Sequence, residues 1–277
     1  MTSILTAVAA MAGLGMVLSI VLGLAAKVFY VYVDPRIESI LDILPGANCG
    51  GCGYAGCGDY AEAIVQLGGA PNLCVAAGSE TTEAICTLMG LSAELGERKV
   101  ARVFCQGDED TAVKRFDYSG AMDCWAAIIS TGGDKACRYG CVGLGTCVQS
   151  CPFNALSMGD SGLPVVNEIL CTGCGNCVQA CPRNIPQLIP ASQKTANLCS
   201  SRDGGKTVKQ VCSMGCIACG QCVKKCPQKA VSMSNKLAVV DAQRCTGHNI
   251  CIEKCPTGSM VNLVAEEKGQ ETQEASA

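Results

Sequence analysis

Cysteine is the residue type through which this sequence is best equipped to do chemistry. The 277-residue chain carries 24 cysteines, many of them two or three residues apart, and a single histidine. Thiolates at such spacings are typical of metal sites, whereas disulfide scaffolds are usually short secreted chains. They also require a reducing compartment. We therefore expect most of these cysteines to bind metal inside the cell.

Four segments follow or approach the run C-x₂-C-x₂-C-x₃-C-P, which holds iron–sulfur clusters in bacterial ferredoxins. Two copies are exact, one from Cys171 to Pro182 and one from Cys216 to Pro227. The segments that end at Pro152 and Pro256 each lack one thiol of the pattern. Zinc is disfavoured, because it takes four tetrahedral ligands in two pairs and not a three-plus-one run. The sequence predicts several [4Fe–4S] clusters.

The pairing of these runs resembles two-cluster bacterial ferredoxins, in which the cysteine before proline ligates the cluster of the other run. This resemblance implies that the third site comprises Cys151, Cys171, Cys174 and Cys177. The fourth site would comprise Cys216, Cys219, Cys222 and Cys255. In the first run Leu144 occupies a ligand position and an extra thiol lies upstream. The second site is therefore predicted to comprise Cys137, Cys141, Cys147 and Cys181.

The fourth run has a histidine where the pattern has a cysteine. Its fifth site would combine Cys226, Cys245 and Cys251 with His248. Three interpretations remain open. His248 ligates iron and raises the reduction potential, as histidine does in Rieske centres; the site holds a three-iron, [3Fe–4S] cluster; or the site is empty and His248 is a surface loop residue.

An upstream segment predicts a first site of different spacing. It reads C-x₂-C-x₄-C, is rich in glycine so that backbone N–H groups can approach sulfur, and supplies Cys49, Cys52, Cys57 and, further on, Cys74. Of the five cysteines left over, Cys86 lies in an apolar stretch and is predicted to be a core residue. The other four predict either buried thiols or a sixth cluster held by Cys105, Cys124, Cys199 and Cys212.

The elements that position these cysteines are predicted to be short. Two β-rich segments with central turns, 155–166 and 230–240, predict one hairpin between the runs of each pair. We expect an α+β chain with an N-terminal transmembrane helix, a small Cys-rich [4Fe–4S] domain and two bacterial-type two-cluster ferredoxin modules. The predicted boundaries are an anchor at 1–33, the Cys-rich domain at 34–90, a connecting segment at 91–130, ferredoxin modules at 131–190 and 191–260, and a disordered acidic tail at 261–277.

The N-terminus predicts a membrane anchor. Ile4 to Ala26 is an uncharged run of 23 residues, and at about 1.5 Å per residue it can cross a hydrocarbon core of about 30 Å. No basic residue precedes it and no convincing cleavage site follows, which favours an anchor over a cleaved signal peptide. Lys27 and Arg36 follow the span, so the positive-inside rule places the body of the chain in the cytoplasm. We predict a single-pass protein of the bacterial cytoplasmic membrane.

Charge is distributed unevenly along the chain. Residues 34–181 hold 8 basic and 17 acidic side chains, whereas residues 182–254 hold 11 basic and 3 acidic ones. The basic half lacks the interleaved aromatic residues of a nucleic-acid stacking platform, so nucleic acid is not an expected partner. Its charge suits an acidic protein partner instead.

The chain as a whole resembles the B-subunit family of Rnf complexes, which are membrane-bound ferredoxin:NAD⁺ oxidoreductases that pump Na⁺ or H⁺. The resemblance covers the anchor, the CGGCGYAGC site, the segments 101–105 and 123–127, and most distinctively the run ACRYGCVGLGTCVQSCPFNAL from Ala136. It implies an electron relay without bond chemistry, supplied by soluble reduced ferredoxin and delivering to other membrane and flavin subunits. The histidine at 248 departs from the family's usual cysteine.

Two other functions stay open at this point. The chain could be the iron–sulfur subunit of another anaerobic respiratory complex, or of the related complex that keeps a redox-sensing regulator reduced. In a non-redox alternative, clusters or zinc would only stabilise the fold of a protein whose function is to bind other proteins.

Overall fold

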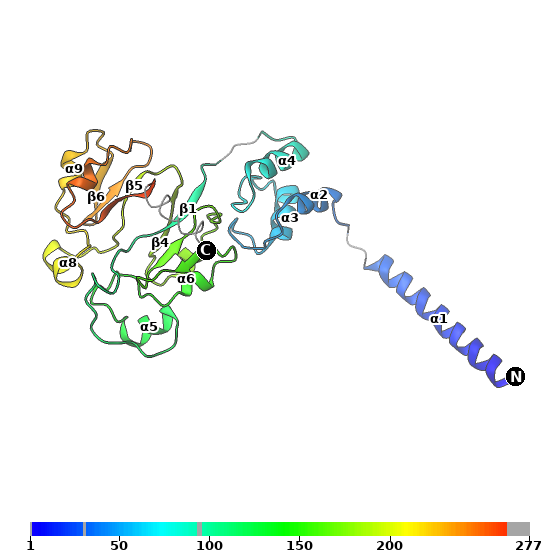
Figure 1. The fold of residues 1–277 in the computed structure, drawn as a ribbon. Coiled ribbons are helices and arrows are strands. Elements are labelled where there is room, and N and C mark those ends of the chain that lie inside the picture. The colour runs from blue at the N-terminus through cyan, green and yellow to red at the C-terminus, as the bar shows by residue number, and fades with distance from the viewer. Residues whose placement is uncertain (1, 30–31, 93–95, 265–277) are drawn as a thin grey trace, which may run out of the picture.

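The computed structural model describes residues 2–29, 32–92 and 96–264. It begins with one long helix, α1 (Thr2–Val28), which extends away from the rest of the chain (Figure 1). Among the described residues, α1 alone contains a segment, Val8–Val28, that is long and apolar enough to cross a membrane, and that segment is not buried against protein. The predicted span at 4–26 lies within this helix. Most of the predicted acidic tail, residues 265–277, lies outside the described residues.

Three helices form a small domain after α1. They are α2 (Pro35–Ile43), α3 (Cys57–Leu67) and α4 (Ser79–Met89). Asp34 begins α2, because its carboxylate accepts a hydrogen bond from the Arg36 N–H at 2.9 Å and Pro35 fills the first helical position, where no N–H is needed. The core among the helices consists of Ile40, Leu44, Tyr60, Ala61, Ile64 and Ile85.

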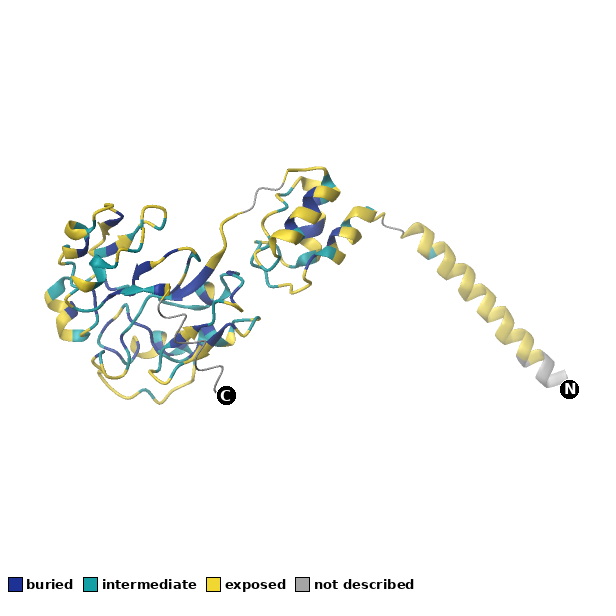
Figure 2. Cartoon of the chain, turned by 45° about the horizontal axis from the view of Figure 1, so that its top comes forward, coloured by how far each residue is buried: buried dark blue, intermediate teal, exposed yellow. Residues whose placement is uncertain are grey.

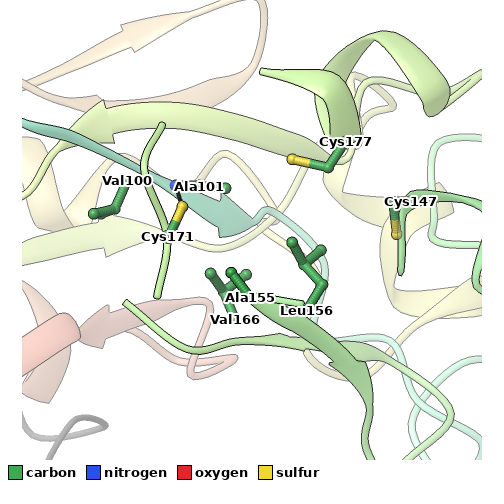
Figure 3. Packing of buried hydrophobic residues seen from close by; sticks show 8 residues of the cluster. All are labelled: Val100, Ala101, Cys147, Ala155, Leu156, Val166, Cys171 and Cys177. Atoms are coloured by element: carbon green, nitrogen blue, oxygen red, sulfur yellow. Dashed lines mark hydrogen bonds between the residues drawn. The ribbon is translucent and has the colours of Figure 1, made fainter. Parts of the chain in front are cut away.

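The first module, residues 99–190, combines two small antiparallel sheets with short helices. Strand β1 (Lys99–Val103) pairs with β4 (Pro186–Pro190), and β2 (Leu156–Met158) pairs with β3 (Pro164–Val166). The helices are α5 (Cys124–Thr131), α6 (Thr146–Gln149) and α7 (Asn176–Ala180). Its core mixes aliphatic side chains with cysteines (Figure 3).

The second module, residues 195–262, repeats this arrangement of sheets. Strand β5 (Thr195–Asn197) pairs with β8 (Met260–Asn262), and β6 (Val231–Ser234) pairs with β7 (Leu237–Val240). The helices are α8 (Gly205–Val211), α9 (Gln221–Lys225) and α10 (Ile250–Glu253). In both modules one sheet joins the two ends of the unit and the other is the hairpin between the cysteine runs.

The two predicted hairpins are confirmed by the β2–β3 and β6–β7 pairings. The segment 91–130, predicted as a connection, contributes β1 to the first module, where it pairs with β4. An apolar cluster of Ile189, Ala196, Leu198 and Leu263 joins β4 to the second module. Buried residues lie inside the helical domain and the two modules, whereas the segment Val8–Val28 of α1 is exposed apart from half-buried Ala25 (Figure 2).

Candidate iron–sulfur sites

The four cysteine runs share one backbone conformation. In each run three positions are left-handed: the second residue after the opening cysteine (Cys141 in the first run), the residue before the short helix, and the third residue after the final cysteine. These residues are Gly143, Gly145 and Asn154; Gly173, Gly175 and Asn184; Ala218, Gly220 and Lys229; and Gly247, Asn249 and Gly258. The fourth run therefore keeps the conformation of the others although it contains His248.

The cysteine before each proline is hydrogen-bonded to the residue four positions later. In the first three runs a backbone N–H donates to sulfur at 3.4, 3.4 and 3.3 Å, from Ala155, Ile185 and Ala230 respectively. In the fourth run the Ser259 hydroxyl lies 3.4 Å from Cys255 Sγ. Hydrogen bonds to sulfur stabilise thiolate charge and tune iron–sulfur clusters. These contacts fit sulfurs that carry the charge of a bound cluster.

Two sets of side chains each line one pocket in the second module. The first pocket is lined by Cys216, Cys219, Cys222 and Cys255, the residues predicted for the fourth site. The second is lined by Cys226, Cys245, His248 and Cys251, the residues predicted for the fifth site. Cys219 is exposed, whereas the other 23 cysteines are buried or half-buried. The fourth site therefore has one candidate ligand, Cys219, at the protein surface.

Cys171 and Cys177 of the predicted third site lie in the core of the first module (Figure 3), and Cys151 packs against that core. The Ala101 N–H of β1 donates to Cys171 Sγ at 3.4 Å. Burial raises the pKa of Cys177 to about 12, and the neighbouring thiols of Cys171 and Cys174 add to the rise. A thiolate in such a place needs a nearby cation, which bound iron would supply.

The pocket of the second site is lined by a different set of cysteines from the one predicted. Its thiols are Cys124, Cys141, Cys147 and Cys181. Cys124 begins α5 and belongs to the same apolar cluster as Leu144, the residue that occupies the missing ligand position. The Cys124 N–H donates to Thr146 Oγ1 at 2.8 Å, which holds α5 against α6. Burial raises the pKa of Cys147 to about 11, with contributions from Cys181 and Cys124.

The thiol that this arrangement leaves over, Cys137, faces another pocket. That pocket is lined by Cys105, Cys137, Cys199 and Cys212, together with residues of both modules. The structure therefore brings together three of the four residues predicted for a sixth site, with Cys137 in place of Cys124.

The Cys-rich domain brings the thiols of the predicted first site to the beginning of α3. Cys52, Cys57 and Cys74 pack against the core of the three helices. The Cys57 N–H, at the start of α3, donates to Asn48 Oδ1 at 2.8 Å. Burial raises the pKa of Cys74, and the thiols of Cys52 and Cys57 contribute to the rise. Cys49 lies next to Asn48 in the preceding loop.

Tyr60 fixes the loop that leads to Cys74. Its side chain is 1% exposed, its hydroxyl donates to the Ala70 carbonyl at 2.9 Å, and it accepts from the Leu73 N–H at 3.1 Å. Burial raises the pKa of Tyr60 to about 12, so the hydroxyl stays protonated and able to donate.

Replacing Tyr60 with phenylalanine is expected to loosen this loop. Leaving two backbone groups without their partner costs about 1–3 kcal/mol, which corresponds to roughly 5- to 150-fold faster amide exchange at residues 70–74. Hydrogen exchange of the anaerobic, cluster-loaded chain measures this. Tyr54→Phe is the control, because the Tyr54 hydroxyl makes no hydrogen bond within the described parts of the chain. Unchanged exchange in Tyr60→Phe would show that the hydroxyl does not hold the loop.

The Cys-rich domain contacts the first module beside the third site. The Asn176 side-chain amide donates to the Cys49 carbonyl at 3.2 Å. A Cβ added to Gly51 would lie 3.0 Å from both Cα and Cβ of Cys174, and 2.8 Å from Val75 Cγ2. The first and third sites therefore lie side by side at the contact between Cys174 and Gly51, whose lack of a side chain allows this close approach.

The sulfurs are grouped around pockets and do not converge on single points. Within residues 2–29, 32–92 and 96–264, no three His, Cys, Asp or Glu side chains are arranged to hold one metal ion. The donor sets are nevertheless suited to iron–sulfur clusters, because they consist of cysteines, with one histidine at the fifth site, and hydrogen-bond donors are directed at several of the sulfurs.

Family models match the three cysteine-rich parts of the chain. A model described as "Putative Fe-S cluster" matches residues 44–76. Two models described as "4Fe-4S dicluster domain" match residues 137–185 and 215–259. The chain therefore has iron–sulfur domains at the first site and in both modules.

Curated relatives are similar over nearly the whole chain. The B subunit of the proton-translocating ferredoxin:NAD⁺ oxidoreductase complex of Clostridium ljungdahlii is 46% identical over 96% of this chain and 94% of its own length. The B subunit of the ion-translocating oxidoreductase complex of Methanosarcina acetivorans is 44% identical over 92% of this chain and 97% of its own. The B subunit of the Na⁺-translocating ferredoxin:NAD⁺ oxidoreductase complex of Acetobacterium woodii is 44% identical over 92% of this chain and 77% of its own.

Proposed function

This chain belongs to the family of B subunits of ion-translocating (Rnf) ferredoxin:NAD⁺ oxidoreductase complexes, and we propose that it relays electrons from reduced ferredoxin into such a complex. Its iron–sulfur domains and family membership support a role in electron transfer within an oxidoreductase complex. The observation that carries the proposal is the series of cysteine-rich sites from exposed Cys219 to Cys49 in the domain that follows α1.

Five cluster sites follow from this proposal. The first comprises Cys49, Cys52, Cys57 and Cys74; the second Cys124, Cys141, Cys147 and Cys181; the third Cys151, Cys171, Cys174 and Cys177; the fourth Cys216, Cys219, Cys222 and Cys255; and the fifth Cys226, Cys245, His248 and Cys251. When bound, each cluster supplies reversible one-electron redox chemistry. The protein's part is to ligate iron, donate N–H groups to sulfur and exclude water.

His248 is assigned as the fourth ligand of the fifth site. It lines the same pocket as Cys226, Cys245 and Cys251, and Asn249 beside it has the left-handed conformation (φ 58°) that glycine has in the other three runs. Asparagine tolerates this conformation better than most residues. The local fold of a ligand-bearing run is thus retained around the histidine.

Electron entry is proposed at the second module. Cys219 is exposed, and Lys224 and Lys225 lie exposed in the last turn of the helix that follows it. Residues 182–254 carry 11 basic against 3 acidic side chains. An acidic ferredoxin would be steered to such a surface and brought within reach of the fourth site.

Reversing the charge of Lys224 and Lys225 to glutamate is expected to slow association with reduced ferredoxin by about 10- to 100-fold at low ionic strength. The difference should shrink in high salt, because salt screens exposed charges. Stopped-flow reduction of the chain by ferredoxin over a salt series measures both effects. Lys99→Glu with Lys114→Glu, an equal charge change on the first module, is the control. A rate that is independent of salt in the unmodified chain would rule out this docking surface.

Delivery is proposed through the contact between Cys174 and Gly51, which joins the third site to the first. The Cys-rich domain directly follows α1, which we propose to anchor the chain as a single span with its body in the cytoplasm, since Lys27 and Arg36 follow the span. The first site would then lie nearest the membrane and the other membrane and flavin subunits of the complex.

A further inference from the structure

One pocket lined by cysteines lies between the two modules and belongs to none of the five sites. Cys105 follows β1, Cys137 precedes the first cluster run, Cys199 follows β5, and Cys212 follows α8. The backbones are joined there by an antiparallel bridge between Ala112 and Cys212. Four segments that are distant in sequence thus bring one thiol each to the same pocket.

Two of these sulfurs lie near one glycine, Gly107, and the thiols of Cys137 and Cys212 interact electrostatically with that of Cys105. A Cβ added to Gly107 would lie 3.5 Å from Cys212 Sγ and 3.7 Å from Cys105 Sγ, and one added to Gly140 would lie 3.6 Å from Cys137 Sγ. Cys105 Sγ accepts from the Cys141 N–H at 3.3 Å, and Cys199 Sγ accepts from the Ser201 N–H at 3.5 Å. These are the same kinds of contact that the sulfurs of the cluster runs receive.

A buried lysine lies beside these thiols. Lys135 is 4% exposed, lines the pocket, and donates from Nζ to the Gly107 carbonyl at 2.6 Å. Burying an ammonium group is costly unless opposite charge lies nearby. The carboxylates of Asp108 and Glu109 lie near enough to interact electrostatically with Lys135, and four thiolates around an iron–sulfur cluster would add to this negative charge. By contrast Cys86, on α4, is buried in the helical domain and lines none of the four pockets described above.

We propose that Cys105, Cys137, Cys199 and Cys212 bind a sixth [4Fe–4S] cluster between the two modules. In this assignment Cys137 ligates the sixth cluster and not the second. Cys124, which lies beside Leu144, is the fourth ligand of the second cluster. The sixth cluster would lie between the fourth site, which is near the surface, and the second and third sites of the first module. The assignment requires that the chain binds iron–sulfur clusters but does not depend on ferredoxin as the donor.

The test removes two of the ligands from the full-length chain after anaerobic reconstitution with iron and sulfide. The Cys199→Ala, Cys212→Ala variant should contain about four fewer iron atoms and about four fewer sulfides than the unmodified chain. Cys86→Ala, which removes a buried thiol outside all proposed sites, should lose none. Gly107→Leu keeps all 24 cysteines but directs a side chain toward two of the sulfurs, and should show the same loss.

Adding Cys124→Ala to the double variant separates the two possible pairings. If Cys124 ligates the second cluster, the triple variant should lose more than the four irons of the sixth: about one more if a three-iron cluster remains, and about four more if the second cluster is lost. If Cys124 ligates the sixth cluster, the loss should stay near four. Unchanged iron content in both the double variant and Gly107→Leu would overturn the sixth site, and so would zinc in its place. An unmodified chain without iron would instead overturn the relay itself, so the two failures are distinguishable.

Discussion

Replacing Gly51 with valine is expected to separate the Cys-rich domain from the first module and to slow electron delivery toward the membrane by about 10- to 100-fold. The added side chain would meet Cys174 Cα and Cβ at 3.0 Å and Val75 Cγ2 at 2.8 Å. Overpacking of this kind costs about 1–3 kcal/mol, and each 1.4 kcal/mol lowers the docked population by about tenfold. The backbone of Gly51 is not in the left-handed region, so the effect would come from the contact and not from local strain.

Two measurements check this result. In the reduced chain, EPR signals of the first and third clusters should lose their mutual magnetic broadening. In the assembled complex, ferredoxin-dependent NAD⁺ reduction should slow. Gly58→Val is the matched control, because a Cβ at Gly58 meets nothing within 4 Å and its φ is not positive. Equal broadening and equal rates in the two variants would mean that electrons do not pass through this contact.

The parts of the sites that could be predicted from the sequence are those fixed by local spacing. The C-x₂-C-x₂-C runs predict which thiols share a backbone conformation, and each hairpin follows from β-rich segments with a turn between them. The pockets of the fourth and fifth sites are lined by the residues predicted from these runs together with the ligand exchange that the resemblance to two-cluster ferredoxins implies. Three ligand positions of each site lie in one run of about a dozen residues, so local spacing predicts them, whereas the exchanged cysteine follows from the resemblance alone.

The sequence alone could not predict that Cys124 lines the pocket of the second site and Cys137 the pocket of the proposed sixth site. Cys124 reaches the second pocket through α5, a helix whose position depends on the hydrogen bond of its first N–H with Thr146. Cys137 is only four residues from Cys141, yet faces a pocket shared with Cys199 and Cys212. The signal available in the sequence was Leu144, which occupies a ligand position, so that the first run has one thiol too few for its cluster. Which distant cysteine replaces it depends on tertiary packing.

The role of residues 91–130 also depended on tertiary structure. Strand β1 is short and has no hairpin partner nearby in sequence, so nothing local identifies it as part of the first module. It pairs with β4, which lies more than eighty residues later, and supplies the Ala101 N–H to Cys171 Sγ. The contact between Gly51 and Cys174 joins segments even further apart, and a glycine in a glycine-rich loop gives no hint of its partner.

Converting His248 to cysteine is expected to lower the midpoint potential of the fifth cluster by about 100 mV or more. An anionic thiolate would replace a neutral imidazole, and Rieske centres with two histidines lie at about −150 to +300 mV against about −400 mV for all-cysteine plant-type ferredoxins. Cys226, Cys245 and Cys251 already line the pocket, and the left-handed Asn249 keeps the run in the conformation of its all-cysteine counterparts, so the new thiol should reach iron without rearrangement. Redox-titrated EPR would show the shift.

Iron content separates the three possible states of this site. With His248 as a ligand, His248→Cys should leave the iron count unchanged while the potential falls, and His248→Ala should lose about one iron and show a three-iron signal. A site that holds three irons naturally would instead gain about one in His248→Cys. Asn249→Gly, which restores the residue found at this position in the other runs, is the control and should change neither quantity. Because a raised potential would make the fifth cluster an electron sink, His248→Cys should turn it into a step of the relay. Identical spectra and iron counts in the unmodified chain, His248→Cys and His248→Ala would show that the histidine never contacts iron.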